Sequence, residues 1–375
     1  MTVGMTRILA ASSPGQVRVA VMAGGVLQDY ALWRPGAPDG VGDLHRGRLI
    51  ARVPAMAGAF VALDGTEGFL PDSAGATGLT AGAMLGVRIT RAAQGGKGPR
   101  LTARLDDAGR ALAATADGRP RLLRRGAGAL ERLAAQYPSA PVLTDDPSLA
   151  ARLGPALGER VSVARALFDE TLAAELDGLA APSVTLACGA RLHIEPTRAL
   201  TAIDIDAGSA TADRRGKQAA QRALNEAVLP ALARQIRLRN LSGAILVDLT
   251  GLARRRAALA PALVAALADD PLRPRLLGFT ALGLAELVRA RIHPALHELL
   301  AGPHAAGLAA LQQAAAEIAA QPSRALALRA GPPIVAALQA DSEALADLAR
   351  RAGRPLILRS DPAMAPGGWI LETPA

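Results

Sequence analysis

Cysteine is almost absent from this sequence of 375 residues, and long apolar runs are missing. The one cysteine, Cys188, excludes an internal disulfide and, without a Cys-x-x-Cys pair, a structural zinc site built from thiolates. No apolar run approaches the ~18 to 20 uncharged residues of a membrane-spanning helix. The start, MTVGMTRILAASSPG, also lacks the apolar block of a signal peptide. These absences predict a cytoplasmic protein that does not enter a membrane.

Lysine is also scarce, and Lys97 and Lys217 are the only two. Arginine therefore supplies nearly all of the positive charge, and the formal net charge is +9. Two interpretations stay open. The codon bias of a GC-rich genome enriches Ala, Gly, Arg and Pro together, whereas a polyanionic partner favours guanidinium groups, which bind phosphate through a rigid fork. With 50% hydrophobic residues, the chain can bury a sizeable core.

Strand patterns dominate the first part of the chain. Residues 5–34 predict three strands separated by Ser-Pro-Gly and Gly-Gly turns. After a linker rich in Pro and Gly at 35–40, short apolar strands follow at the close spacing of a small β-barrel. We therefore expect an all-β module that ends near residue 105.

Helices and strands alternate in the rest of the chain. Residues 106–183 show mainly helical spacing. From 184 onward, the runs RLHIEP, LTAIDIDA, AILVDLTG and LLGFTALG predict strands, and residues 214–238 and the run LAELVRARI predict helices. This alternation is typical of an α/β fold. The end of the chain, 301–375, predicts a helical segment and a small α/β region.

Two of these apolar strands carry aspartates at positions that suit a hydrophobic residue. Asp204 and Asp206 are two residues apart, so their side chains share one face of a strand. Asp248 lies near the carboxyl end of AILVDLTG, where open α/β sheets bind their ligands. Such carboxylates normally have a partner or a metal, and their oxygens suit Mg²⁺ or Mn²⁺. The alternative is that they cap strand ends and bind backbone amides.

The expected barrel carries an aromatic pair beside basic residues. Phe60 and Phe69 are two of only four phenylalanines in the chain and lie in adjacent predicted strands. The loop AAQGGKGPR adds Lys97 and Arg100. Small barrels hold single-stranded nucleic acid with aromatic faces that stack on bases and cations that follow the backbone. The alternative is that both rings fill the barrel core.

The ordered motifs resemble those of the ribonuclease E and ribonuclease G endoribonucleases. The runs LHIEPTRALTAIDIDAG, NEAVLPALARQIRLRNLSGAILVDLTGL and LLGFTALGLAELVRARIHPAL resemble their catalytic core. The run VRVAVMAGGVLQDYALWRPG resembles the strands that precede their S1 domain, and GRLIARVPAMAGAFVALDGTEGFLPDS with GGKGPRLTARL resembles the S1 domain itself.

The resemblance implies an α/β fold with a ribonuclease H-like catalytic core, an inserted S1 (OB-fold) β-barrel and a small C-terminal α/β region. The implied parts are N-terminal strands of the core at 1–35, the barrel at 36–105, a shortened connecting region at 106–183, the catalytic core at 184–300 and the C-terminal region at 301–375.

The resemblance also implies site residues. Asp204 and Asp248 would bind the catalytic Mg²⁺, with Mn²⁺ as a substitute. Asp206 stands where the family usually has an asparagine, and it is a candidate third ligand. RNA-binding positions of the S1 domain fall on Phe60, Phe69 and Lys97. We add Arg91 to this set, and we name Arg237, Arg239, Arg289 and Arg291 as candidate contacts to the RNA backbone.

Two features of the family are missing. The arginine-threonine pocket that recognises a 5′-monophosphate has no clear counterpart, and the paired cysteines that share a zinc ion between subunits are absent. We therefore expect no zinc, and a monomer or a homodimer without a zinc link. The expected activity is cleavage of single-stranded RNA by a Mg²⁺-activated water. The alternative is a non-catalytic S1-domain protein that binds RNA in RNA handling or ribosome assembly.

Overall fold

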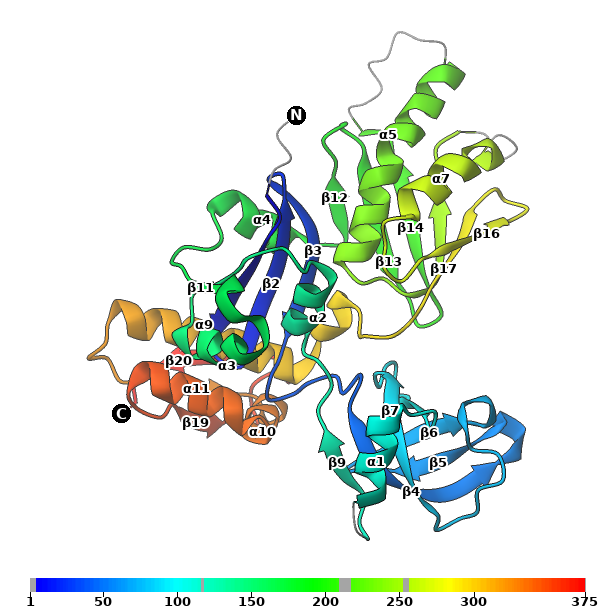
Figure 1. Cartoon of the computed structure of the whole chain (residues 1–375). Coiled ribbons are helices and arrows are strands. Elements are labelled where there is room, and N and C mark those ends of the chain that lie inside the picture. The colour runs from blue at the N-terminus through cyan, green and yellow to red at the C-terminus, as the bar shows by residue number, and fades with distance from the viewer. Residues whose placement is uncertain (1–4, 116–117, 209–216, 252–255, 375) are drawn as a thin grey trace. The chain divides into compact units, whose positions relative to one another are not determined.

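The structure, a computed structural model, describes residues 5–115, 118–208, 217–251 and 256–374 (Figure 1). Helices and strands are mixed throughout, which confirms the α/β class. Within the described residues, no helix has the length and apolar character needed to cross a membrane. The chain divides into a larger unit (Met1–Pro38, Ala129–Ala290 and Ala295–Ala375) and a smaller unit (Asp39–Gly128 and Arg291–Pro294).

The first sheet of the larger unit has the strand order β11-β10-β1-β2-β3. The first three strands form an antiparallel meander, whose turns at Gly15 and Gly24–Gly25 have the positive φ angles that glycine adopts without strain. The two later strands run parallel to β1. The strands are β1 (Arg7–Ser13), β2 (Gln16–Ala23), β3 (Val26–Trp33), β10 (Val142–Thr144) and β11 (Val161–Val163).

Helices cover both faces of this sheet. On one face, Leu130 of α2 and Leu149 of α3 pack in a core with Ile8. On the other face, Leu172 of α4 packs with Leu9. Among the described residues, the strands of 1–35 therefore pair with β10 and not with the strands of 184–300, contrary to the expectation of one shared core. The helices are α2 (Ala129–Gln136), α3 (Pro147–Leu157) and α4 (Glu170–Gly178).

The smaller unit contains a closed barrel of five strands in the order β4-β5-β6-β8-β7, in which β7 pairs again with β4. Leu49, Val61, Leu70 and Leu101 fill its core. This closure agrees with the expected S1 or OB-type barrel. The strands are β4 (Leu44–Val53), β5 (Gly58–Ala62), β6 (Glu67–Pro71), β7 (Met84–Arg91) and β8 (Arg100–Thr102).

The smaller unit continues beyond residue 105, where we expected the barrel module to end. Strand β9 (Arg121–Arg124) pairs with β4, and helix α1 (Asp107–Thr115) belongs to the same unit. The buried carboxylate of Asp43 then accepts a hydrogen bond of 2.7 Å from the backbone N–H of Gly126. These contacts hold the segment on the barrel. Only the later part of the expected connecting region therefore belongs to the larger unit.

A six-stranded sheet, which we name the aspartate sheet, has the order β12-β13-β14-β15-β17-β16. Its central strands β14 and β15 are parallel and are connected through the long helix α5. Helices α5 and α7 supply Leu229 and Leu263 to the core under one face. The elements are β12 (Ser183–Thr185), β13 (Arg191–Pro196), β14 (Leu200–Asp206), α5 (Lys217–Leu238), β15 (Gly243–Asp248), α7 (Ala260–Leu267), β16 (Arg275–Phe279) and β17 (Ala285–Arg289).

The run LAELVRARI forms strand β17, and the prediction of a helix there is wrong. Ala285, Leu287 and Arg289 are buried, and they alternate with the partly exposed Glu286 and Val288. β17 pairs with β15 on one side and β16 on the other. Hydrogen bonding to two neighbours outweighs the helix propensity of Ala, Glu and Leu.

The last part of the larger unit combines helices with a three-stranded sheet of order β19-β18-β20. Leu311, Leu328, Ile334 and Leu348 are fully buried in its core. The elements are α8 (Leu296–Leu299), α9 (Gly302–Ala320), β18 (Ala327–Ala330), α10 (Pro332–Ala340), α11 (Ser342–Ala352), β19 (Ile357–Ser360) and β20 (Trp369–Glu372).

Candidate functional site

Strand alternation places the aspartates of β14 on the open face of the aspartate sheet. Ile203 and Ile205 are buried against the helices that cover the other face. Asp204 lies between these two isoleucines in the sequence, Asp206 follows the second, and both aspartates are exposed. Because successive side chains of a strand point to opposite faces, both carboxylates lie on the side away from the helices.

Asp248 of β15 lies beside Asp204. The two residues are Cα partners in the parallel pairing of β14 and β15. Val247, the residue before Asp248, is buried in the same core as Ile203, so the two aspartates project from the same face. Paired strands lie about 4.8 Å apart. The sheet therefore brings together the two residues that sequence reasoning chose as metal ligands.

Arg256 lies against Asp248. Its Nη1 atom is 2.7 Å from Oδ1 of Asp248, an ion pair in which Arg256 is the more buried partner. Oδ1 itself is buried, and no donor among the described residues reaches it in hydrogen-bond geometry. The ion pair therefore neutralises the charge of Asp248, but Oδ1 of Asp248 still accepts no hydrogen bond. A carboxylate in this state can still bind a cation.

Asn225 of α5 fixes the backbone that follows Asp248. Its side-chain amide donates to the carbonyl of Thr250 at 3.0 Å, and its Oδ1 accepts from the N–H of Thr250 at 3.1 Å. Gly251, which comes next, has φ +94°, a backbone conformation that favours glycine. Arg256 donates to the carbonyl of Gly251 at 3.1 Å. The crossover helix thus positions both Asp248 and its cationic partner.

Asp206 differs from the other two aspartates. It lies beyond the last residue pair of β14 and β15, and its Cα partner is Arg191 on β13. Its Oδ1 accepts a hydrogen bond of 3.0 Å from the backbone N–H of Gly208. Within the described parts of the chain, no group of three His, Cys, Asp or Glu side chains is arranged to hold a metal ion. The role of Asp206 as a third ligand stays a prediction.

The open face also carries polar residues that sequence reasoning did not select for this site. His193 of β13 is the Cα partner of Asp204 on the side away from Asp248. Glu286 of β17 pairs with Leu246, two residues before Asp248. The alternation within RLHIEP could have placed His193 on this face, but the sequence gives no pairing register. Glu286 was hidden by the incorrect helix prediction.

Phe60 and Phe69 lie on the outside of the barrel. They are Cα partners on β5 and β6, and their ring centroids are 5.7 Å apart in an edge-to-face arrangement. Both are partly exposed, and their neighbours Val61 and Leu70 fill the core instead. A methyl group at Gly58 would collide with the ring of Phe69, so the glycine makes room for it. The alternative that both rings are barrel core is excluded.

Basic residues lie beside the two rings. Arg100 is the Cα partner of Phe69 and also of Arg91. Lys97 is exposed in a short hairpin closed by its backbone bridge to Gln94. The smaller unit thus brings all four predicted RNA-binding residues, Phe60, Phe69, Arg91 and Lys97, to one part of the barrel with Arg100.

The positive charge around Arg91 is concentrated. Burial, followed by repulsion from Arg100 and Arg291, lowers the pKa of Arg91 below its ordinary value. The Nε of Arg91 is buried without a hydrogen-bond acceptor among the described residues. The carbonyl of Ile292 accepts from the N–H of Ala92 at 2.8 Å, which holds the segment of Arg291 on the barrel. These cations favour an anion at this surface.

Three of the four arginines that we named as candidate contacts to the RNA backbone instead form buried contacts within the larger unit. Arg289 is 4% exposed and forms a two-pronged ion pair with Asp270 at 2.7 and 3.2 Å. Arg239 is 5% exposed and donates to the carbonyl of Ala181 at 2.5 Å. Arg237 is largely buried and forms an ion pair of 3.3 Å with Asp29. Their charges hold the larger unit together and do not face solvent.

Comparison with known proteins identifies the region around the paired aspartates. A model of the ribonuclease E/G family matches residues 147–292. This region of the chain is similar to the ribonuclease E/G family. Ribonuclease E of Nostoc sp. is 39% identical over 120 residues, which make up 32% of this chain and 17% of that protein. Ribonuclease G of Escherichia coli (strain K12) is 34% identical over 119 residues, 31% of this chain and 24% of that protein.

The ribonuclease E/G match includes the aspartate sheet from β12 to β17, with Asp204 and Asp248 at its centre. It does not include the barrel. The alignment with the Escherichia coli protein covers less than a third of this chain and less than a quarter of that relative. The matched region is thus the part of the chain in which the two aspartates meet.

Proposed function

We propose that the protein is a metal-dependent endoribonuclease that cleaves single-stranded RNA. The observation that carries this proposal is the Cα pairing of Asp204 with Asp248 on the open face of a sheet that lies within the ribonuclease E/G match. Two carboxylates at the carboxyl ends of parallel strands occupy the usual ligand position of open α/β sheets. The ribonuclease H-like character of this core stays a prediction.

The two carboxylates fit Mg²⁺, with Mn²⁺ as a substitute. Mg²⁺ is commonly held by one or two carboxylates and keeps several waters, so it does not require a dense cage of protein ligands. Oδ1 of Asp248 accepts no hydrogen bond among the described residues, and a bound ion would replace its ion pair with Arg256. When bound, such an ion supplies charge neutralisation at a phosphate and activation of a water. Zinc has no thiolate set here, since Cys188 is the one cysteine.

The residues of this chain have separate roles in the proposed reaction. Asp204 and Asp248 would hold the ion, and Asn225 positions the backbone after Asp248. Arg256 can turn from Asp248 to a phosphate oxygen once the carboxylate has a cation partner, because a guanidinium group binds either anion through the same donors. His193, the Cα partner of Asp204, would hydrogen-bond a group bound at Asp204.

The barrel surface provides the proposed RNA clamp. Phe60 and Phe69 present ring faces and edges for stacking, and Arg91, Lys97 and Arg100 provide charge for the backbone. This combination binds single strands without strong sequence preference, since every base has a stacking face. Cleavage in the aspartate sheet and binding on the barrel are therefore separable by mutation.

The test is incubation of a labelled, unstructured RNA oligonucleotide with the wild-type chain, with Mg²⁺ and with EDTA. We expect internal cleavage with Mg²⁺ and none with EDTA. RNA that stays intact with Mg²⁺ while binding with normal salt dependence would support the alternative, a non-catalytic S1-domain protein. Phe60→Ala serves as the matched variant, because it should weaken RNA binding without touching the aspartates.

A further inference from the structure

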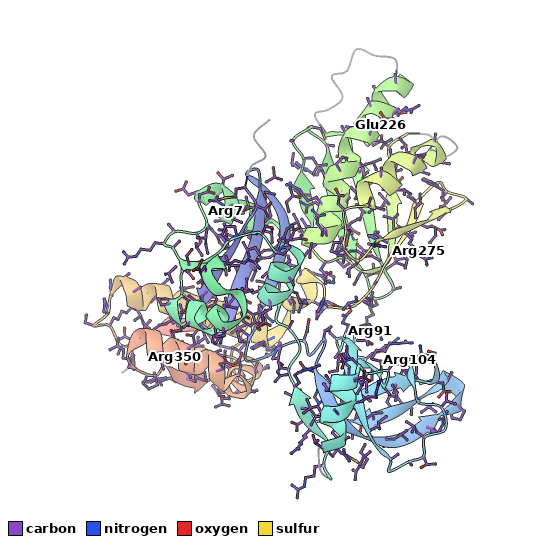
Figure 2. The ribbon with its side chains drawn as sticks, in the orientation of Figure 1. Arg7, Arg91, Arg104, Glu226, Arg275 and Arg350 are labelled. Carbon is purple, nitrogen blue, oxygen red and sulfur yellow. The ribbon has the colours of Figure 1, made fainter. Side chains whose placement is uncertain are left out.

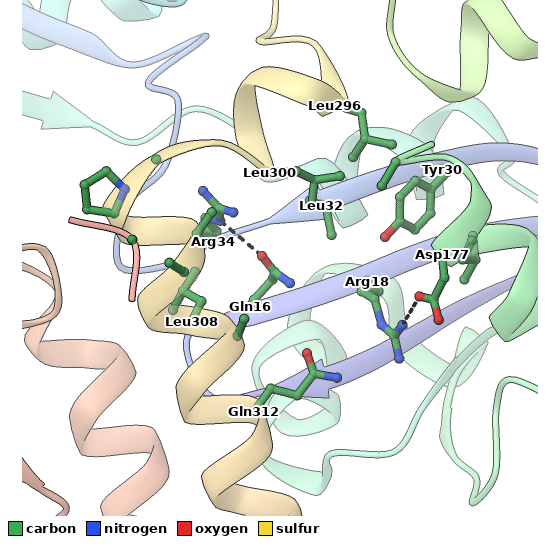
Figure 3. A pocket seen from close by; sticks show the side chains of 18 of the residues that line it. Gln16, Arg18, Tyr30, Leu32, Arg34, Asp177, Leu296, Leu300, Leu308 and Gln312 are labelled. Carbon is green, nitrogen blue, oxygen red and sulfur yellow. Dashed lines mark hydrogen bonds and ion pairs between the residues drawn. The ribbon is translucent and has the colours of Figure 1, made fainter. Parts of the chain in front are cut away.

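A cavity of about 680 Å³ lies between the first sheet and helix α9, away from the aspartates (Figure 3). Its floor is formed by β2 and β3, whose residues on this face alternate along each strand. Leucines and alanines form most of the apolar wall, and a few polar side chains interrupt it. The lining is typical of a small-molecule site in both size and composition. The apolar wall includes Leu32, Leu176, Leu296, Leu300 and Leu308.

Arg34 is the first cation of this cavity. Its guanidinium donates to Oε1 of Gln16 at 3.1 Å and to the carbonyl of Leu299 at 2.5 Å, which are both neutral acceptors. Burial lowers the pKa of Arg34, and Asp341 opposes this only in part. Asp341 is itself hydrogen-bonded to His304 at 2.9 Å. Among the described residues, no carboxylate forms an ion pair with Arg34, so its charge is not neutralised.

Arg18 of β2 and Tyr30 of β3 lie on the floor of the cavity (Figure 3). Among the residues that the structure describes, Arg18 forms a long ion pair of 3.7 Å with Asp177, whose side chain is 77% exposed. Its guanidinium carbon lies 5.1 Å from the ring centre of Phe168, a cation–π contact. Burial raises the pKa of Tyr30, so its hydroxyl stays a neutral donor. The polar groups of the cavity are therefore mainly donors and cations.

We propose that this cavity binds a small organic acid with an apolar body, whose acid group is held by Arg34 and Arg18. Arginine binds carboxylate and phosphate groups through parallel N–H donors, and this preference strengthens where water is excluded. The leucine wall would contact the apolar body. An uncharged ligand of the same shape would leave Arg34 without a counter-charge. The site is independent of RNA cleavage, because neither aspartate lines it.

The test uses two fluorescent probes with one aromatic body. Anilinonaphthalene sulfonate carries an anionic group, and N-phenylnaphthylamine does not. Titration of the full chain should show the anionic probe binding about tenfold more tightly, the effect of one or two charged hydrogen bonds. Arg34→Gln should remove this preference and leave the affinity of the neutral probe unchanged. Equal affinity of both probes for the wild type would overturn the proposal.

A second pair of variants shows where the probes bind. Ala309, on α9, lines the cavity and is exposed, so Ala309→Trp should fill the space and weaken both probes about tenfold or more without disturbing the core. Ala316 is exposed on the same helix and does not line the cavity, so Ala316→Trp is the matched control. Unchanged binding to Ala309→Trp would place the probes elsewhere and contradict the proposal.

Displacement identifies the acid group. Octanoate and octyl phosphate have the same apolar body with a carboxylate or a phosphate, and octanol has neither. We expect one of the two acids to displace anilinonaphthalene sulfonate at a concentration at least about tenfold below that of octanol. The acid that displaces the probe at the lower concentration shows whether the site prefers a carboxylate or a phosphate. Displacement by octanol as effective as that by both acids would overturn the assignment of an anion site.

Discussion

Asp204 and Asp248 are direct Cα partners in the parallel pairing of β14 and β15, and both project from the face that the helices leave uncovered. Their separation in the sequence is spanned by α5, the crossover helix. The same helix carries Asn225, which binds the backbone immediately after Asp248. One βαβ connection thus supplies both carboxylates and the group that positions one of them. Figure 2 labels Glu226 on this helix and Arg275 on strand β16 of the same sheet.

Arg256 should compete with a metal ion for Asp248. Because its Nη1 is 2.7 Å from Oδ1 of Asp248, Arg256→Met removes a positive charge that opposes cation binding. We expect the dissociation constant for Mn²⁺, measured by electron paramagnetic resonance without RNA, to fall about fivefold, the effect of a partly exposed ion pair. Arg222→Met, which removes an exposed arginine of α5, should leave it unchanged. Weaker Mn²⁺ binding to Arg256→Met would contradict this account.

Asn225→Ala should destabilise the larger unit and slow cleavage together. The substitution leaves the N–H and hydroxyl of Thr250 without their shared acceptor. We expect a loss of about 1 to 3 kcal/mol in the free energy of unfolding in urea. Arg222→Ala, at an exposed position of the same helix, should change it by less than about 0.5 kcal/mol. If Asn225→Ala is as stable as this control, the hydrogen bonds to Thr250 do not position the site.

Phe69 and Leu70 are neighbours with opposite roles, because they point to opposite sides of the barrel wall. Phe69→Ala should weaken binding of unstructured RNA by about 1 to 3 kcal/mol, the value of one stacked base, with little loss of stability. Leu70 is fully buried, so Leu70→Ala should destabilise the barrel by about 2 to 5 kcal/mol. Fluorescence anisotropy and thermal unfolding separate the two effects. Unchanged RNA affinity in a destabilised Phe69→Ala would show that the ring only packs.

Asp361 should make stability depend on pH at the acid end. Hydrogen bonds from the backbone N–H of Ala363, and then from Arg329, hold the pKa of Asp361 below its ordinary value. A depressed carboxyl pKa stabilises the folded state at any pH above the unfolded pKa, and this stabilisation disappears as the pH falls through the folded value. The difference in unfolding free energy between wild type and Asp361→Asn should therefore shrink as the pH is lowered from 7 to 3. A constant difference would contradict this.

The sequence was most informative where strand alternation is strong. The pattern of LTAIDIDAG identifies the face of Asp204 because Ile203 and Ile205 must be buried. The pattern of the barrel strands likewise separates Phe69 from Leu70. In both cases the period of two residues, and not the identity of any distant partner, decides which side chains are exposed.

The sequence was least informative where pairing between distant segments decides the outcome. LAELVRARI shows helical spacing, and only its position between β15 and β16 makes it a strand. Arg239 and Arg289 add to the net charge, yet both are buried in polar networks whose partners lie far away in the sequence. The cavity at Arg34 combines residues from Gln16 to Gly367, so no local pattern could predict it.

The most direct test of the central claim is the rate of RNA cleavage by Asp204→Asn, Asp248→Asn and the double variant, at equal RNA binding and with Mg²⁺ present. If one ion is held by both carboxylates, each single variant should lose at least about a hundredfold in rate. The double variant should then be no slower than the slower single variant, because either single substitution already abolishes binding of the ion. Wild-type cleavage by either single variant would contradict the paired-aspartate metal site.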